Sequence, residues 1–187
     1  MKVSKGQYGY HSYLRKINTI KTVIFFAVSI ALFVAGYMQT GTRNNVLTVV
    51  AILGCLPASK SAVNMIMAFR AKGCSKEAAE VIKPYGENVC LLYDCYVTSE
   101  KKSFDLSCVA VAKEYIYGYT ECEKTDTEAA GKHIQDILKM NKMPVIPVKI
   151  LTDREVFAER LRDMENNVEE DRKETEDLVR LLKAISL

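Results

Sequence analysis

TVIFFAVSIALFVAGYMQTGT, residues 22–42, is the stretch that decides the architecture, because none of its 21 residues carries a charge. In a helix with a rise of about 1.5 Å per residue, this run spans about 30 Å, the thickness of the hydrocarbon core of a bilayer. A second apolar run covers residues 46–69 and contains one charge, Lys60. No small-x-small cleavage pattern follows the first run, so a cleaved signal peptide fits less well than a membrane helix. We therefore expect a transmembrane hairpin over residues 22–72.

Positive charge around the two runs predicts the topology. Residues 1–21 carry five Lys or Arg, the connecting turn carries Arg43 alone, and residues 70–76 carry three more. Segments rich in Lys and Arg stay on the cytoplasmic side of a membrane. We therefore expect a two-pass protein of the inner membrane of a bacterium-like cell, with both termini in the cytoplasm. The lipid bilayer is the first partner that we expect.

Acidic residues are confined to the second part of the chain. Residues 1–76 contain ten Lys or Arg and no acid, whereas residues 77–187 contain 16 bases and all 23 acids. The second part therefore has a net charge of −7. It repels a polyanion at long range, so we do not expect a nucleic acid partner. An apolar content of 49% also excludes a disordered chain.

Beyond the hairpin, the pattern is typical of a small cytosolic α/β domain. Three runs of strand-forming residues are followed by a helix with a capping box, a further strand and a second capping box. The expected elements are a helix at 75–81, strands at 89–97, 104–112 and 115–121, a helix from 125, a strand at 144–151 and a helix from 152. The predicted fold class is α+β, a two-helix transmembrane hairpin followed by a domain in the order α-β-β-β-α-β-α. Its parts are a basic segment 1–21, the hairpin 22–72, the domain 73–152 and a C-terminal helix 153–187.

The C-terminal helix carries a heptad pattern. Steps of four and three residues connect nine positions, of which seven are apolar, as in the seam of a coiled coil. Either the helix breaks near residues 166–167 and packs on its own sheet, or an interruption by two polar residues sets the register between copies. Leu178, Leu182 and Ile185 are the predicted contact residues of a self-associating helix. The nine positions are Phe157, Leu161, Met164, Val168, Asp171, Thr175, Leu178, Leu182 and Ile185.

Common catalytic motifs are absent from the sequence. It contains no phosphate-binding glycine loop, no dinucleotide fingerprint and no nucleophile elbow. The six cysteines show no C-x-x-C spacing, and a cytosolic location keeps thiols reduced, so we expect neither a zinc site nor a disulfide framework. The sequence therefore predicts no cofactor and favours a protein that is not an enzyme.

One acidic set nevertheless has the composition of a metal site. Asp94 and Asp105 lie on the first two predicted strands, and Glu121, Glu123 and Lys124 lie at the end of the third. Metal-dependent cleavage of phosphodiesters requires two or three carboxylates on Mg²⁺ or Mn²⁺ and a basic group that orients water or stabilises the transition state. Charged strand ends at a solvent boundary are the alternative interpretation.

In element order, residues 75–152 resemble the core of restriction-endonuclease-like nucleases with the PD-(D/E)xK motif. Asp105 matches the aspartate of that family's second strand, and residues 121–124, Glu-Cys-Glu-Lys, lie where Glu-x-Lys is expected. The resemblance implies Asp105, Glu121 and Glu123 as metal ligands, with Asp105, Glu121 and Lys124 in catalysis. The chain departs from the motif, since Glu121 and Lys124 face opposite sides of a regular strand. The resemblance therefore implies either an active nuclease-like enzyme or a degenerate descendant without catalysis.

Two further groups of residues are candidates for binding. Tyr115, Tyr117 and Tyr119 share one strand face, where they bind a protein partner or pack across strands. Ser59, Lys60 and Asn64 lie within the second membrane run, about two-thirds of the way across for Lys60. There Lys60 extends to the headgroups, or the three residues face a partner or a small pore built from several copies.

The leading hypothesis from the sequence is a membrane-anchored, non-catalytic protein. It presents a small cytosolic α+β domain to a protein partner or to a second copy of the chain. The alternative is a membrane-tethered, metal-dependent, nuclease-like enzyme, possible only with Mg²⁺ or Mn²⁺. The two hypotheses assign different roles to Asp105 and Glu121. In the first these acids stabilise the fold, and in the second they ligate a metal.

Overall fold

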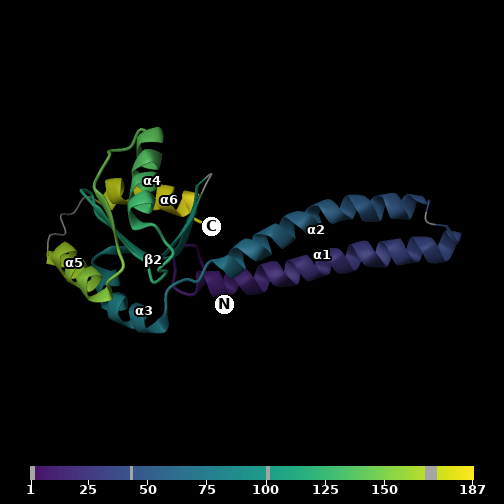
Figure 1. Cartoon of the computed structure of the whole chain (residues 1–187), viewed down its shortest axis with the longest axis horizontal. Helices are drawn as coiled ribbons and strands as arrows, with labels where there is room; N and C mark the ends of the chain where they lie inside the picture. The colour runs from purple at the N-terminus through teal and green to yellow at the C-terminus, as the bar shows by residue number, and fades with distance from the viewer. Residues whose placement is uncertain (1–2, 43, 100–101, 167–171) are drawn as a thin grey trace. The chain divides into compact units, whose positions relative to one another are not determined.

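The computed structural model describes residues 3–42, 44–99, 102–166 and 172–187. In these residues the fold is mixed α+β, with six α-helices and a four-stranded sheet, and two of the helices are long, apolar and N-terminal (Figure 1). The chain divides into two compact units. One unit is the helical hairpin, residues 12–70, and the other, the sheet unit, contains the rest of the described chain.

Two helices form the hairpin, α1 (Tyr10–Thr40) and α2 (Val46–Arg70). Both are long and apolar enough to span a membrane, and only 17% of the most apolar window of each is buried. A core helix of a soluble protein is mostly buried, so this exposure agrees with the expected pair of membrane helices. Arg43, on which the predicted topology partly rests, lies outside the described residues.

Small side chains make the contact between α1 and α2. Ala51, Ala58 and Ala68 are buried on α2. The hydroxyl groups of Thr22 and Ser61 lie 2.9 Å apart in a buried hydrogen bond. Small residues let two backbones approach closely, and in lipid such packing and hydrogen bonding replace the hydrophobic driving force.

The sheet unit alternates helices and strands. Its strands lie in the order β1-β2-β3-β4, with the first two pairs antiparallel and β3–β4 parallel. The parallel pair is connected through α4, as a crossover requires. The elements are α3 (Lys76–Ile82), a 3-10 turn η1 (Lys83–Glu87), β1 (Cys90–Thr98), β2 (Ser103–Val111), β3 (Ile116–Tyr119), α4 (Thr127–Met140), β4 (Val148–Leu151), α5 (Arg154–Asn166) and α6 (Arg172–Ile185).

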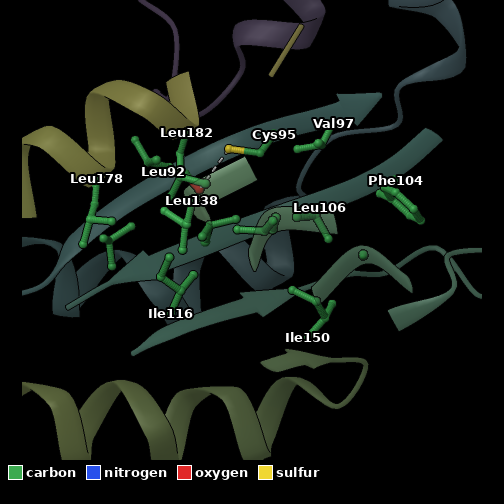
Figure 2. Packing of buried hydrophobic residues seen from close by; sticks show 14 of the residues in the cluster. Leu92, Cys95, Val97, Phe104, Leu106, Ile116, Leu138, Ile150, Leu178 and Leu182 are labelled. Carbon is green, nitrogen blue, oxygen red and sulfur yellow. Dashed lines mark hydrogen bonds between the residues drawn. The ribbon is translucent and has the colours of Figure 1, made fainter. Parts of the chain in front are cut away.

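Two hydrophobic clusters cover the two faces of the sheet. Figure 1 shows α4 and α6 on one face and α3 and α5 on the other. Leu178 and Leu182 of α6 pack beside Leu92 and Leu138 (Figure 2), whereas Phe157 of α5 belongs to the opposite cluster. The two ends of the predicted heptad pattern therefore pack on opposite faces of their own sheet. Val168 and Asp171, which belong to that pattern, lie outside the described residues.

β1 and β2 exchange faces halfway along their pairing. Tyr93 and its partner Cys108 pack in the α3/α5 cluster or against it, but Cys95 and its partner Leu106 pack in the α4/α6 cluster. In a regular strand, residues two apart face the same side. Asp94 lies between Tyr93 and Cys95 in β1. Its φ of 56° is left-handed, and this turn of the backbone moves the following side chains to the other face of the sheet.

The outer edge of β1 is covered by both ends of the described chain. The amide of Tyr93 donates to the carbonyl of Gly6 at 2.9 Å, and the amide of Leu187 donates to the carbonyl of Tyr96 at 2.8 Å. Val97 and Ser186 form a further antiparallel bridge. An uncovered edge strand is a template for unwanted pairing, so these contacts protect the sheet.

Truncating the α6 contact tests whether α6 belongs to this core. We expect Leu182→Ala to lower the free energy of unfolding by about 2–5 kcal/mol, because it leaves a cavity under the sheet. Urea unfolding of the full chain in detergent, followed by near-ultraviolet circular dichroism, measures this change. Val156→Ala, at a partly exposed position of α5, is the control and should change it by less than about 0.5 kcal/mol. If Leu182→Ala instead lowered the mass of an oligomer and left the free energy of unfolding unchanged, α6 would be a contact between copies of the chain.

Candidate functional site

The acidic residues of the strands gather around residues 72–75, the segment between α2 and α3. Asp94 of β1 is 4% exposed. Its Oδ1 accepts a hydrogen bond from the amide of Cys74 at 2.8 Å. Its Oδ2 accepts one from the amide of His11 at 3.2 Å. A carboxylate that binds two amides is a strong acceptor, and here it ties two distant pieces of backbone to one strand.

Asp105 of β2 binds the same segment from the neighbouring strand. Its Oδ2 accepts a hydrogen bond from the amide of Lys72 at 2.8 Å, and its side chain is buried. Burial raises the pKa of Asp105, and the amide of Lys72 and the nearby imidazole of His11 offset only part of this effect. The negative charge of Asp94 raises the pKa further.

Glu121, just beyond β3, completes the set. Its Oε2 accepts a hydrogen bond from the amide of Ser75 at 2.8 Å, and its Oε1 accepts one from the Ser75 hydroxyl at 2.6 Å. The Ser75 hydroxyl in turn accepts from the amide of Ala78 at 3.1 Å and so caps α3. We call Asp94, Asp105 and Glu121, with the amides that they bind, the acidic clamp.

Gly73 lies at the centre of the acidic clamp. Its φ of 80° is left-handed, and a Cβ added there would lie 2.7 Å from Oδ1 of Asp94 and 3.4 Å from Cδ2 of His11. His11 is buried, and its ring lies edge-on to that of Tyr96, with centroids 6.5 Å apart. Only glycine combines this backbone with so close an approach of carboxylate and imidazole.

The predicted metal ligands are thus only partly brought together. Asp105 and Glu121 bind the same segment, each through a different residue of it. Glu123 and Lys124 are exposed in the loop after β3. In the described part of the chain, no three His, Cys, Asp or Glu side chains are arranged to hold a metal ion together.

The predicted binding residues of the sheet unit lie largely inside it. Tyr119 is buried and stacks on Phe157 of α5, with ring centroids 5.4 Å apart. Tyr115 and Tyr117 are half-buried, and their ring centroids lie 5.2 Å apart. Leu178 and Leu182 are buried, and Ile185 packs against their cluster. These side chains therefore supply internal packing in this structure.

Two cysteines near the clamp, Cys74 and Cys95, have thiols that are not activated. Burial raises the pKa of Cys74 to about 12, and the charges of Glu121 and Asp94 add to the effect. Burial likewise raises the pKa of Cys95 to about 12. A thiol with so high a pKa carries little thiolate at neutral pH and is a poor nucleophile.

The polar residues of the second membrane run lie on the surface of the hairpin. Ser59, Lys60 and Asn64 are exposed there. The Ser59 hydroxyl donates to the carbonyl of Cys55 at 2.8 Å, within its own helix. The carbonyl of Asn64 accepts a hydrogen bond from the Asn18 side chain at 3.4 Å. Ser59, Lys60 and Asn64 therefore do not enclose a binding site within one copy of the chain.

Sequence reasoning missed His11 and residues 72–75 as parts of the site. His11 lies 83 residues from Asp94 along the chain, and no local pattern marks that pairing. Gly73 beside the helix-capping Ser75 was the one available signal, since such a glycine indicates left-handed backbone before a cap.

No family model, curated protein or solved structure matches the chain. The features of this chain that bear on function are the hairpin, the acidic clamp and the surface of the sheet unit. Of these, the clamp uses its carboxylates for backbone amides, which is a structural task.

Gly73→Ala tests the central contact of the clamp. We expect a loss of about 1–2 kcal/mol for left-handed backbone and about 1–3 kcal/mol more for crowding Asp94. Gly9→Ala is the matched control, because Gly9 has a φ of 82° but nothing within 4 Å of an added Cβ. Urea unfolding of both full-length variants in detergent measures the difference. Equal losses in the two variants would show that the close approach to Asp94 has no energetic weight.

Proposed function

We propose that this chain is a two-pass inner-membrane protein that presents its sheet unit in the cytoplasm as a binding module, with both termini on that side. The two apolar, exposed helices support the membrane part of the proposal. The uneven distribution of basic residues supports the orientation. The binding role rests on the surface of the sheet unit and on how its acids are used.

The acidic clamp is the observation that carries the non-catalytic part of the proposal. Asp94, Asp105 and Glu121 accept hydrogen bonds from four backbone amides and one hydroxyl, all from residues 11 and 72–75. To ligate a metal through these same oxygens, the carboxylates would have to release the amides that they bind, and a buried donor left unpaired costs about 1–3 kcal/mol. The clamp therefore favours a structural role for the acids.

The loop between α4 and β4 supplies a surface for a partner. Met140 and Val145 are 81% and 59% exposed, the highest values among the large apolar residues described in the sheet unit. Next to them is an open groove that Met143 and Leu181 line. Two protruding apolar side chains beside a groove of mixed polarity are a candidate surface for a protein partner.

A second copy of the chain is the partner that fits this surface. Asp177 and Arg180 also line the groove, and their charges are opposite. In a two-fold interface, the same patch of each copy meets the other, so Asp177 of one copy would face Arg180 of the next while Met140 enters the groove. The proposed function is thus self-association through the α4–β4 loop.

Removing the two protruding side chains tests this self-association. We expect the full chain in detergent to sediment as a dimer, and Met140→Ser/Val145→Ser to shift it to a monomer, because the apolar burial is lost. Analytical ultracentrifugation of both proteins at matched detergent density measures the mass. Val81→Ser/Val156→Ser, at two partly exposed positions elsewhere, should leave the dimer intact. A wild-type monomer at all concentrations contradicts the proposal.

The nuclease-like alternative keeps one supporting observation, the convergence of Asp105 and Glu121 on one segment. It demands that Mg²⁺ or Mn²⁺ displace the amides and that Lys124 move toward the acids. The resemblance to the PD-(D/E)xK nucleases belongs to this alternative.

A calorimetric titration with Mn²⁺ separates the two functions. We expect the full chain in detergent and its Asp105→Asn variant to give the same heat, since Asp105 binds an amide rather than a metal. Glu155→Gln, at an exposed position of α5, is the control for a change in surface charge. Heat that disappears in Asp105→Asn but persists in Glu155→Gln would establish a metal site and support the nuclease-like enzyme.

A further inference from the structure

The contact between α1 and α2 places two lysines of the hairpin at the same level. Thr22 and Ser61 share a hydrogen bond of 2.9 Å between the antiparallel helices. Lys21 precedes Thr22 and Lys60 precedes Ser61, and both lysines are exposed. Lys60 therefore shares its level with the last base before the first apolar run.

From this level to the turn, most of the exposed side chains of the hairpin are apolar. Val23, Ile24 and Phe33 on α1, and Val49, Ile52 and Leu56 on α2, are among its exposed side chains. At about 1.5 Å per residue, α1 continues for about 27 Å from Thr22 and α2 for about 22 Å from Ser61. A bilayer core is about 30 Å thick, so the level of the two lysines corresponds to its boundary.

On the other side of this level, cations and apolar side chains are interspersed. Lys16 and Arg70 are exposed, as are Ile20, Val63 and Phe69. Residues 1–76 contain no Asp or Glu, so the hairpin unit has no carboxylate of its own to neutralise these charges. An uncompensated cationic surface with apolar side chains is complementary to the anionic headgroup layer of a membrane.

We propose that Lys16, Lys21, Lys60 and Arg70, the basic belt, bind the phosphate groups of anionic phospholipids. This inference rests on the proposed membrane location and adds the class of lipid that the hairpin selects. The four-carbon stems of Lys21 and Lys60 lie along the acyl chains while their ammonium groups reach the phosphates. The ammonium groups bind as point charges, so the belt distinguishes lipids by headgroup charge.

The test compares lipids that remain bound to the full-length protein. The protein is inserted into vesicles of equal parts phosphatidylglycerol and phosphatidylcholine, checked by resistance to carbonate extraction, released in mild detergent and weighed by native mass spectrometry. We expect bound phosphatidylglycerol to exceed phosphatidylcholine, and Lys21→Gln/Lys60→Gln to lower this ratio by about fivefold per lysine. Lys21→Arg/Lys60→Arg keeps the charge and should keep the ratio.

Lys132→Gln/Lys139→Gln, which removes two exposed charges from α4 of the sheet unit, is the control and should leave the ratio unchanged. An inserted wild-type protein with no preference, or an equal loss in the control, overturns the basic belt alone. Extraction of the wild-type protein by carbonate overturns the membrane location as well. A preference that survives Lys21→Gln/Lys60→Gln together with a larger assembly mass would assign Lys60 to a contact between copies.

Discussion

The hydrogen bonds between strand carboxylates and backbone amides are the constraint on which the sheet unit depends. Asp94 changes the face of β1 and, in the same place, binds the amides of His11 and Cys74. One side chain thus joins the beginning of α1, the segment after α2 and an edge strand. Backbone amides at or beyond the end of a helix have no partner within the helix, so they need other hydrogen-bond acceptors when they are buried. An ionised carboxylate is the strongest acceptor that a side chain offers. Burial raises the pKa of Asp105 beside it, because the charged carboxylate loses contact with water, and the charge of Asp94 adds a smaller effect in the same direction.

The same constraint explains why the most suggestive acids of the sequence need not be catalytic. Asp105 and Glu121 are the two acids that the sequence pattern offered most clearly as metal ligands. In the structure, Oδ2 of Asp105 accepts a hydrogen bond from Lys72, and both carboxylate oxygens of Glu121 accept hydrogen bonds from Ser75. A carboxylate at a strand end therefore has two uses, binding a cation or binding backbone, and composition alone does not separate them. The accepted hydrogen bonds favour the second use for this chain.

Periodicity predicted the coarse fold because it reports local burial. The two apolar runs predicted the long helices α1 and α2, and runs of strand-forming residues predicted a sheet in a mixed α+β fold. Periodicity did not assign faces or partners. The heptad steps from Phe157 to Ile185 suit a coiled coil, yet their two ends pack on opposite faces of one sheet. A pattern shows that one side of a helix is buried, and only the fold shows against what.

By itself, the sequence determined the two apolar helices, the separation of basic and acidic halves and the mixed α+β class, since these follow from composition and short-range spacing. Tertiary structure decided the acidic clamp, in which His11 meets Asp94 from 83 residues away. It also decided that Lys60 shares a level with Lys21, through the hydrogen bond between Thr22 and Ser61. Both depend on the register between segments distant in the chain. That register is set by packing and by the satisfaction of buried polar groups, which no local pattern of residues records.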